Sequence, residues 1–271
     1  MTFTLTPLGT AAPHPQPGRP CSGYLVEAGD AKVWMDAGPG TFAELQRHVR
    51  PGELTAIWIS HLHSDHWTDL IAAEAGISDG GLGIERPIPV YAPADAPRRL
   101  ACFYGRPDPG PLAEVFAFRP IEDGRPVDLG GPAPTSGAVE HGGPEFTSYA
   151  VEHGGIEAYG ARIAYDGAVL AYTGDSGPCA ELSRLARGAD VLLAEAYVDR
   201  HEGPPVHLTP EDAAALAREA GAHTLLVTHV GPTLTPDAAT ARAHAAFGGR
   251  TLRAREGVTY EITKNGAHGA S

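Results

Sequence analysis

One short segment, ISHLHSDHWTDL at residues 59–70, constrains this chain more strongly than any other part of its sequence. It places His61, His63, Asp65 and His66 within six positions, directly after a hydrophobic run. Imidazole and carboxylate groups crowded onto one turn indicate a pair of bound metal ions. The chain has 13 histidines, so some fall close together by chance. The pattern of the remaining sequence therefore has to distinguish a chance cluster from a metal site.

Short hydrophobic runs bounded by Gly, Pro and Asp recur along the chain and predict β-strands. Helical patterns lie between several of these runs, and strands that alternate with helices indicate an α/β architecture. The predicted strands are residues 31–38, 56–60, 88–93, 167–175, 190–196 and 223–229.

The clearest predicted helix begins after Thr209, a good N-cap that is followed by proline, and ends at Gly221. A second helix has the same start signal at Thr235, and residues 178–187 are predicted to form a third. The segment 104–145 is rich in Pro and Gly and gives no assignable pattern. No linker composition separates two parts, so we predict a single domain over residues 1–271.

Polar side chains follow the ends of several predicted strands. His61 comes directly after residues 56–60, and His153, Asp175 and His229 each follow a later hydrophobic run. Ligands gather at the carboxyl ends of strands in open α/β sheets, so we expect these side chains to converge on one rim. Imidazole and carboxylate without thiolate suit two divalent cations, zinc first, with manganese or iron as alternatives.

The motif HLHSDH resembles the HxHxDH motif of the metallo-β-lactamase superfamily, and the resemblance extends over nearly the whole chain. VWMDAG, HGGIEAYGARI, YTGDS and VTHVGP resemble later motifs of that family, in the same order. The resemblance implies a four-layer αββα sandwich. It also implies that Asp175 bridges two metal ions, one held by His61, His63 and His153, the other by Asp65, His66 and His229.

Within that superfamily the chain most resembles the ribonuclease Z group and a set of small bacterial cyclic-nucleotide phosphodiesterases. In those proteins a strand ending in HEA or CEA precedes a downstream histidine, and here LLAEA is followed by His207. The resemblance implies a catalytic set of His207, Glu195 and Asp65, the last of which is also a metal ligand. Ala194 departs from the first position of that motif.

A local duplicate leaves an alternative for the third histidine. The segment VEHGG occurs at 139–143 and again at 151–155, so His141 competes with His153. We prefer His153 because only the second copy continues into IEAYG and lies 22 positions before Asp175 (175 − 153).

Charge and composition limit the possible partners. The formal net charge is −13 with no cluster of Lys or Arg, whereas proteins that grip a nucleic-acid backbone usually carry a basic stripe. The 22 positions between His153 and Asp175 also leave no room for the tRNA-binding arm of ribonuclease Z. We therefore expect a small-molecule substrate and neither nucleic acid nor a membrane, with a homodimer left open. The three scattered cysteines and the absence of a signal-peptide pattern predict a cytoplasmic protein.

These observations lead to one main hypothesis, a dinuclear metal-dependent hydrolase of a small phosphodiester such as a cyclic nucleotide. Hydrolysis of a lactone, ester or thioester at the same site is the alternative, because fold and ligands do not determine the substrate. A ribonuclease Z-type tRNA 3′ endonuclease and a metal-stabilised binding protein are less favoured.

Overall fold

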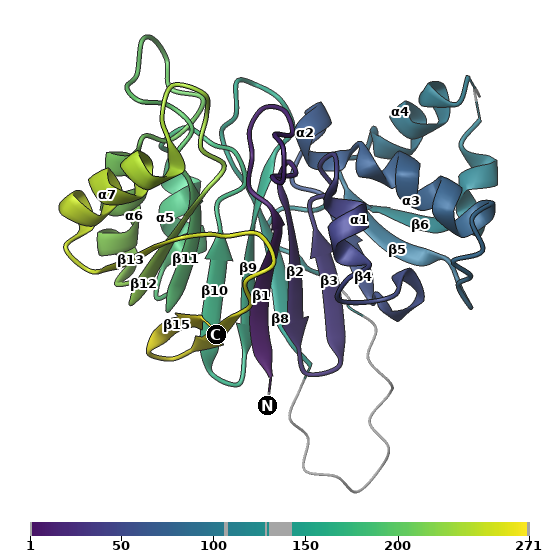
Figure 1. The fold of residues 1–271 in the computed structure, drawn as a ribbon, viewed down its shortest axis with the longest axis horizontal. Helices are drawn as coiled ribbons and strands as arrows, with labels where there is room; N and C mark the ends of the chain where they lie inside the picture. The colour runs from purple at the N-terminus through teal and green to yellow at the C-terminus, as the bar shows by residue number, and fades with distance from the viewer. Residues whose placement is uncertain (1, 106–107, 128, 130–142, 270–271) are drawn as a thin grey trace, which may run out of the picture.

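The computed structural model of the chain describes residues 2–105, 108–127, 129 and 143–269. In this part of the chain the strands form two sheets, and helices gather at both outer sides of the molecule (Figure 1). The first sheet has the spatial order β15 (Gly266–Gly269), β14 (Tyr260–Thr263), β1 (Phe3–Gly9), β2 (Gly23–Ala28), β3 (Ala31–Met35), β4 (Ala56–Trp58), β5 (Ile88–Ala92), β6 (Phe116–Pro120).

The second sheet is built from the later strands of the chain. Its spatial order is β13 (Arg250–Arg253), β12 (Thr224–Thr228), β11 (Val191–Glu195), β10 (Ala168–Tyr172), β9 (Tyr159–Tyr165), β8 (Glu145–Ala150), β7 (Pro126–Val127). The α-helices are α1 (Thr41–Leu45), α2 (Ser64–Trp67), α3 (Asp69–Ser78), α4 (Ala96–Phe103), α5 (Ala180–Ala186), α6 (Pro210–Ala220) and α7 (Pro236–Phe247). Two short 3₁₀ turns, η1 (Pro51–Glu53) and η2 (Gly110–Glu114), complete the described elements.

Successive side chains of the strands point to opposite faces of each sheet, and this alternation creates separate cores. In β3, Met35 packs into the core between the sheets while Trp34 packs outward against helices. In β11, Leu193 points inward and Leu192 points outward in the same way. Both faces of these strands are buried, which explains why their sequences are continuous hydrophobic runs.

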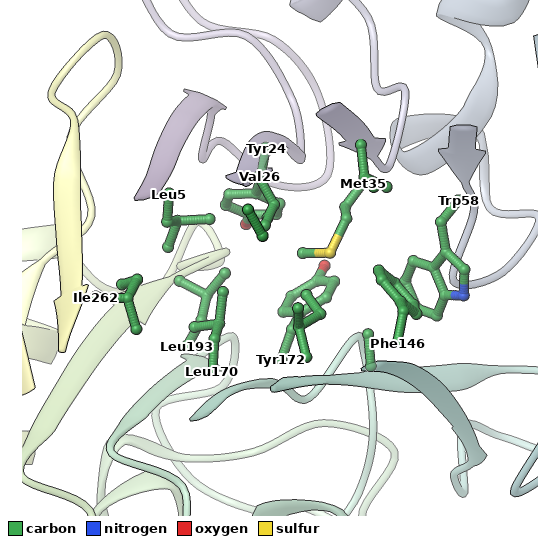
Figure 2. Close-up of a cluster of buried hydrophobic side chains, with 14 of the residues drawn as sticks. Leu5, Tyr24, Val26, Met35, Trp58, Phe146, Leu170, Tyr172, Leu193 and Ile262 are labelled. Carbon is green, nitrogen blue, oxygen red and sulfur yellow. The ribbon is translucent and has the colours of Figure 1, made fainter. Parts of the chain in front are cut away.

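The core between the sheets contains large aromatic and aliphatic side chains. Figure 2 shows Leu5 and Met35 of the first sheet facing Leu170 and Tyr172 of the second. One outer core joins α1, α3 and α4 to the first sheet, and the other joins α5, α6 and α7 to the second. The order of layers is helix, sheet, sheet, helix, so the predicted αββα sandwich is confirmed.

All six strands predicted from hydrophobic runs are present, although each is shorter than its run. The predicted helices correspond to α5, α6 and α7, with Thr209 and Thr235 as N-caps. Part of the unassigned segment 104–145 forms η2, β6 and β7.

Candidate metal centre

The motif segment leaves the first sheet at the carboxyl end of β4. His61 follows that strand almost directly, and His63 is the N-cap of the one-turn helix α2, which carries Asp65 and His66. His61, Asp65 and His66 are buried, whereas His63 is exposed. A short strand followed at once by a helical turn thus directs all four side chains to the same edge of the sheet.

The second sheet supplies three more residues at its facing edge. His153, Asp175 and His229 follow β8, β10 and β12, which run in the same direction because β8 and β10 are both antiparallel to β9 and the others are parallel. Gly154 and Gly155 have φ values of 59° and 76°, which allow the tight turn directly after His153.

The backbone at His229 adopts a conformation that side chains other than glycine rarely take. Its φ is 46°, in the left-handed region. Strained residues of this kind concentrate at functional sites, where the surrounding structure holds them in place.

The seven predicted residues meet in one cluster that spans both sheets. On one side, the Nδ1 atom of His63 lies 3.0 Å from His61 Nε2 and 3.1 Å from His153 Nε2. On the other side, His229 Nε2 lies 3.9 Å from an oxygen of Asp65. The ligand atoms of His61, His63 and His153 lie within 4.8 Å of one another, as do those of Asp65, His66 and His229.

Asp175 lies between the two groups. Its Oδ2 atom is 3.0 Å from His229 Nε2, 3.3 Å from His66 Nε2 and 3.9 Å from His61 Nε2. A carboxylate in this position reaches donor atoms of both groups, which is the arrangement that a bridging ligand requires.

The donor set fits divalent cations. The Asp175 Oδ1 and His66 Nε2 atoms are buried and have no hydrogen-bond partner among the described residues, although buried polar atoms are nearly always paired. Burial lowers the pKa of the His61, His63 and His153 imidazoles, which favours the neutral rings whose lone pairs a cation needs. The His/Asp cluster is therefore suited to binding divalent metal.

Polar groups behind the cluster fix the orientation of its histidine rings. Val206 O accepts a hydrogen bond from His153 Nδ1 at 2.8 Å, and Ser22 Oγ lies 2.7 Å from His229 Nδ1. With Nδ1 engaged outside the cluster, each ring turns Nε2 toward the centre. The sequence did not point to Ser22 or Val206, because neither belongs to a recognisable motif.

Asp36, which follows β3, is the main supporting residue on the first sheet. Its Oδ2 atom accepts hydrogen bonds from His66 Nδ1 and Tyr172 Oη, both at 2.8 Å, and from Ser60 Oγ at 2.9 Å. Its Oδ1 atom accepts from the Ser60 backbone N–H at 2.7 Å. The contribution of Tyr172 was missed because it lies 136 positions away in the sequence.

The predicted pair His207 and Glu195 lies beside the cluster. His207 Nδ1 is 3.0 Å from Glu195 Oε1 and 4.0 Å from Asp175 Oδ2, and its ring stacks on Tyr197 at 4.1 Å between centroids. Burial lowers the pKa of His207, but the hydrogen bond to Glu195 and the negative charges of Glu195 and Asp175 together outweigh burial and leave the pKa raised. Glu195 is buried and also accepts from the Ser176 backbone N–H at 2.8 Å.

The sequence left an alternative for the third histidine of the site. The competing His141 lies outside the described residues, whereas His153 contacts His63. Trp67, the residue directly after the motif, packs in the outer core of the first sheet.

Comparison with known proteins identifies the class to which this fold and site belong. Residues 31–230 match the family model described as a beta-lactamase superfamily domain. The chain therefore belongs to that superfamily, and it is a metallo-hydrolase with the metallo-β-lactamase fold.

Individual relatives refine this assignment. The chain is 33% identical to the uncharacterized protein ML1173 of Mycobacterium leprae, over 97% of this chain and 89% of that protein. It is 31% identical to a ribonuclease Z of Mycolicibacterium paratuberculosis, over 85% of this chain and 86% of that protein. The crystal structure of the metallo-β-lactamase fold protein YhfI from Bacillus subtilis superimposes with a TM-score of 0.78 at 25% identity, covering 96% of this chain and all of that one. The predicted resemblance to the superfamily and its ribonuclease Z group is confirmed.

Within the part of the chain that the structure describes, no helix has both the length and the apolar run needed to cross a bilayer.

Proposed function

We propose that this protein holds two divalent cations, zinc in the first place, and hydrolyses a small phosphodiester such as a cyclic nucleotide. In the proposal His61, His63 and His153 hold one ion and Asp65, His66 and His229 hold the other. Asp175 belongs to both. The interatomic distances within the cluster support this division.

The observation that carries the proposal is the pair of buried Glu195 and partly buried His207 beside the cluster. A scaffold that only binds metal for stability does not need a polarised histidine next to its ligands. His207 lies 4.0 Å from Asp175 and has a carboxylate on its Nδ1 side. That arrangement leaves the other side of the ring to serve a reacting group.

The residues of this chain have separate tasks in such a reaction. Cations bound in the cluster would polarise the phosphate and lower the pKa of a water molecule. His207 donates a proton to the oxygen that leaves phosphorus, and Glu195 keeps the donating tautomer in place through Nδ1. Asp65 is both a ligand and a catalytic residue, and it accepts a proton from the attacking water.

A substrate panel tests this function. The protein is purified, loaded with zinc, manganese or iron, and assayed for turnover of bis-aryl phosphate, cyclic nucleotides, lactones and thioesters, with metal content measured in parallel. We expect about two ions per chain and turnover of the phosphodiesters. Faster hydrolysis of lactones or thioesters than of every phosphodiester would contradict the proposal.

The bridging role of Asp175 gives the panel a matched variant. Asp175→Ala is expected to lower both metal content and activity, because the carboxylate contributes to both groups of ligands. The control is Asp190→Asn, which alters a carboxylate that accepts from the Val169 backbone N–H at 2.8 Å, away from the cluster. Full metal content in Asp175→Ala would rule out the bridge.

A further inference from the structure

A pocket of about 420 Å³ opens beside His207. Its wall is the loop of residues 198–206 between β11 and α6, together with Thr233 from the segment after β12. The volume falls at the lower end of the range of roughly 300–1,000 Å³ that is typical of small-molecule sites. None of the seven residues of the metal cluster lines this pocket, which is a separate compartment that borders the cluster through His207 and Val206.

The loop that forms the pocket is tied down from the neighbouring helices. Arg242 of α7 donates to the Asp199 carboxylate, to the Asp199 carbonyl at 2.9 Å and to Glu211 of α6 at 2.7 Å. His201 Nε2 lies 2.8 Å from an oxygen of Asp212, near the start of α6. These contacts hold both the early and the middle part of the loop, so the pocket is formed before any ligand arrives.

The charged lining of the pocket does not favour an additional anion. Arg200 is accompanied in the lining by two carboxylates, Asp199 and Glu202, and its guanidinium lies 2.9 Å from Glu202. Arg242 pairs with Asp199 and with Glu211, so counting both gives two guanidinium groups against three carboxylates and a formal charge of −1. A second phosphate entering the pocket would therefore meet net negative charge.

The remaining wall is apolar. Val198, Pro204, Pro205 and Val206 contribute aliphatic surface, and 40% of Val206 is exposed, an unusual value for a large hydrophobic residue in this molecule. Rigid proline and valine surfaces suit the face of a planar or sugar ring better than they suit a flexible charged chain.

The position of the pocket determines which part of a substrate enters it. In the function proposed above, His207 gives its proton to the leaving oxygen. The same ring forms one wall of the pocket. The group attached to the leaving oxygen therefore lies on the pocket side, while the phosphate faces the cluster.

We propose that this pocket is the leaving-group subsite and that it takes an uncharged, ring-bearing group such as a nucleoside. The substrate class is then a phosphodiester with one phosphate, and a second phosphate on the leaving side is rejected. This inference rests on the proposed phosphodiesterase function.

The kinetic test uses three dinucleotides with the same scissile bond: thymidylyl-thymidine, and that compound with an extra phosphate at its 5′ end or at its 3′ end. For the metal-loaded protein, we expect kcat/KM to fall about tenfold or more when the extra phosphate is on the end of the dinucleotide that enters the pocket. An extra phosphate on the opposite end is expected to have little effect on kcat/KM. Equal tolerance of both extra phosphates would overturn the inference.

A charge reversal in the pocket wall provides the matched variants. Glu202→Lys is expected to recover most of the lost kcat/KM for the dinucleotide whose extra phosphate enters the pocket, because it gives the lining a net positive charge. Glu219→Lys makes the same change of total charge at the far end of α6, on an exposed position, and is expected to recover none of it. If both variants act alike, the effect belongs to the whole molecule and the pocket is not the subsite.

Binding of thymidine tests the subsite without any reaction. In a titration followed by amide chemical shifts, thymidine is expected to shift resonances of residues 198–206, whereas inorganic diphosphate is expected to leave them unchanged in metal-free protein. Shifts with thymidine but no cleavage of any phosphodiester would refute the proposed function and leave the nucleoside pocket standing. Cleavage of phosphodiesters without any thymidine-induced shift in the loop would refute the subsite alone.

Discussion

Side chains that are not part of the cluster orient the histidine rings that belong to it. Asp36 accepts from His66, Ser60 and Tyr172, and all of these groups are buried. An isosteric amide at position 36 would present an NH₂ group where three donors now converge. Hydrogen-bond partners of this kind are needed for metal affinity even though they do not touch the metal.

We predict that Asp36→Asn lowers the affinity for zinc by about 10–100-fold while the fold is retained. Competition with a chromophoric chelator measures the affinity, and circular dichroism checks the fold. Asp190→Asn serves as the control because Asp190 supports the backbone of Val169 and pairs with His223, away from the cluster. Unchanged zinc affinity in a folded Asp36→Asn protein would show that the hydrogen bond to His66 is dispensable.

His207 allows the chemical step to be separated from metal binding. His207→Ala is expected to leave metal content intact and to reduce turnover by about 10²–10⁴, the usual contribution of a positioned general acid. The reduction should be larger for a cyclic nucleotide than for a nitrophenyl ester, since an activated phenolate leaves without a proton. His48→Ala, an exposed histidine beyond α1, is the control. Loss of metal, or equal slowing of both substrates, would mean that His207 is a ligand or a structural residue.

At the scale of secondary-structure elements, α6 connects stability to the site. Thr209 Oγ1 accepts from the Asp212 backbone N–H at 3.1 Å, and the Asp212 carboxylate accepts in return from the Thr209 backbone N–H at 3.0 Å. This capping box begins two positions after His207, so the start of the helix also fixes the end of the loop that carries the histidine.

Two threonine caps form a matched pair of tests. Thr209→Ala and Thr235→Ala are each expected to lower the free energy of unfolding by about 1 kcal/mol, the typical contribution of an N-cap. Only Thr209→Ala is expected also to reduce kcat, because Thr235 caps α7 on an exposed position. Urea denaturation and steady-state kinetics on both variants measure the two effects. Equal kcat values would show that the cap of α6 does not position His207.

Elements whose signals are local were predictable from the sequence. In α6 and α7 the N-cap threonine is followed directly by the proline that begins the helix, so both signals lie side by side in the sequence. The central strands are continuous hydrophobic runs. The strand β1 was not recognised because Pro7 interrupts its pattern, and β13 was not because three of its four residues are polar. These edge and irregular strands depend on pairing with distant segments, and no short window of sequence reports such pairing.

The residues of the site also divide into those with a local sequence signal and those that depend on contacts between distant segments. The seven cluster residues and the pair of Glu195 and His207 follow strand ends or match motifs, so the sequence alone suggested them. The contact between Ser22 and His229 joins residues 207 positions apart, and it exists only because the two sheets face each other. Supporting contacts of this length require the structure.

At the scale of the whole molecule, the net charge of −13 bears on the choice of substrate. Proteins that bind a nucleic-acid backbone release counterions through clustered Lys and Arg, and this chain has no such cluster. Some of its relatives are named ribonuclease Z, but binding of a tRNA precursor to this chain depends on the charges that this chain carries.

We predict that the purified, metal-loaded protein neither binds tRNA precursors specifically nor trims their 3′ ends. Gel-shift and cleavage assays over a range of salt concentrations measure this, and a ribonuclease Z serves as the positive control. Efficient 3′ cleavage at moderate salt would show that local charge at the site outweighs the overall charge.

The division of the cluster between two sheets also has a consequence for the order in which a ribosome delivers its parts. His61 is made 168 residues before His229 (229 − 61), and Asp175 emerges between them. From residue 61 until His229 is made, the growing chain carries an incomplete set of donors, because His153, Asp175 and His229 are added one after another. A chain that stops before His229 has an incomplete cluster, so the two groups of ligands are complete only after this last residue has been added.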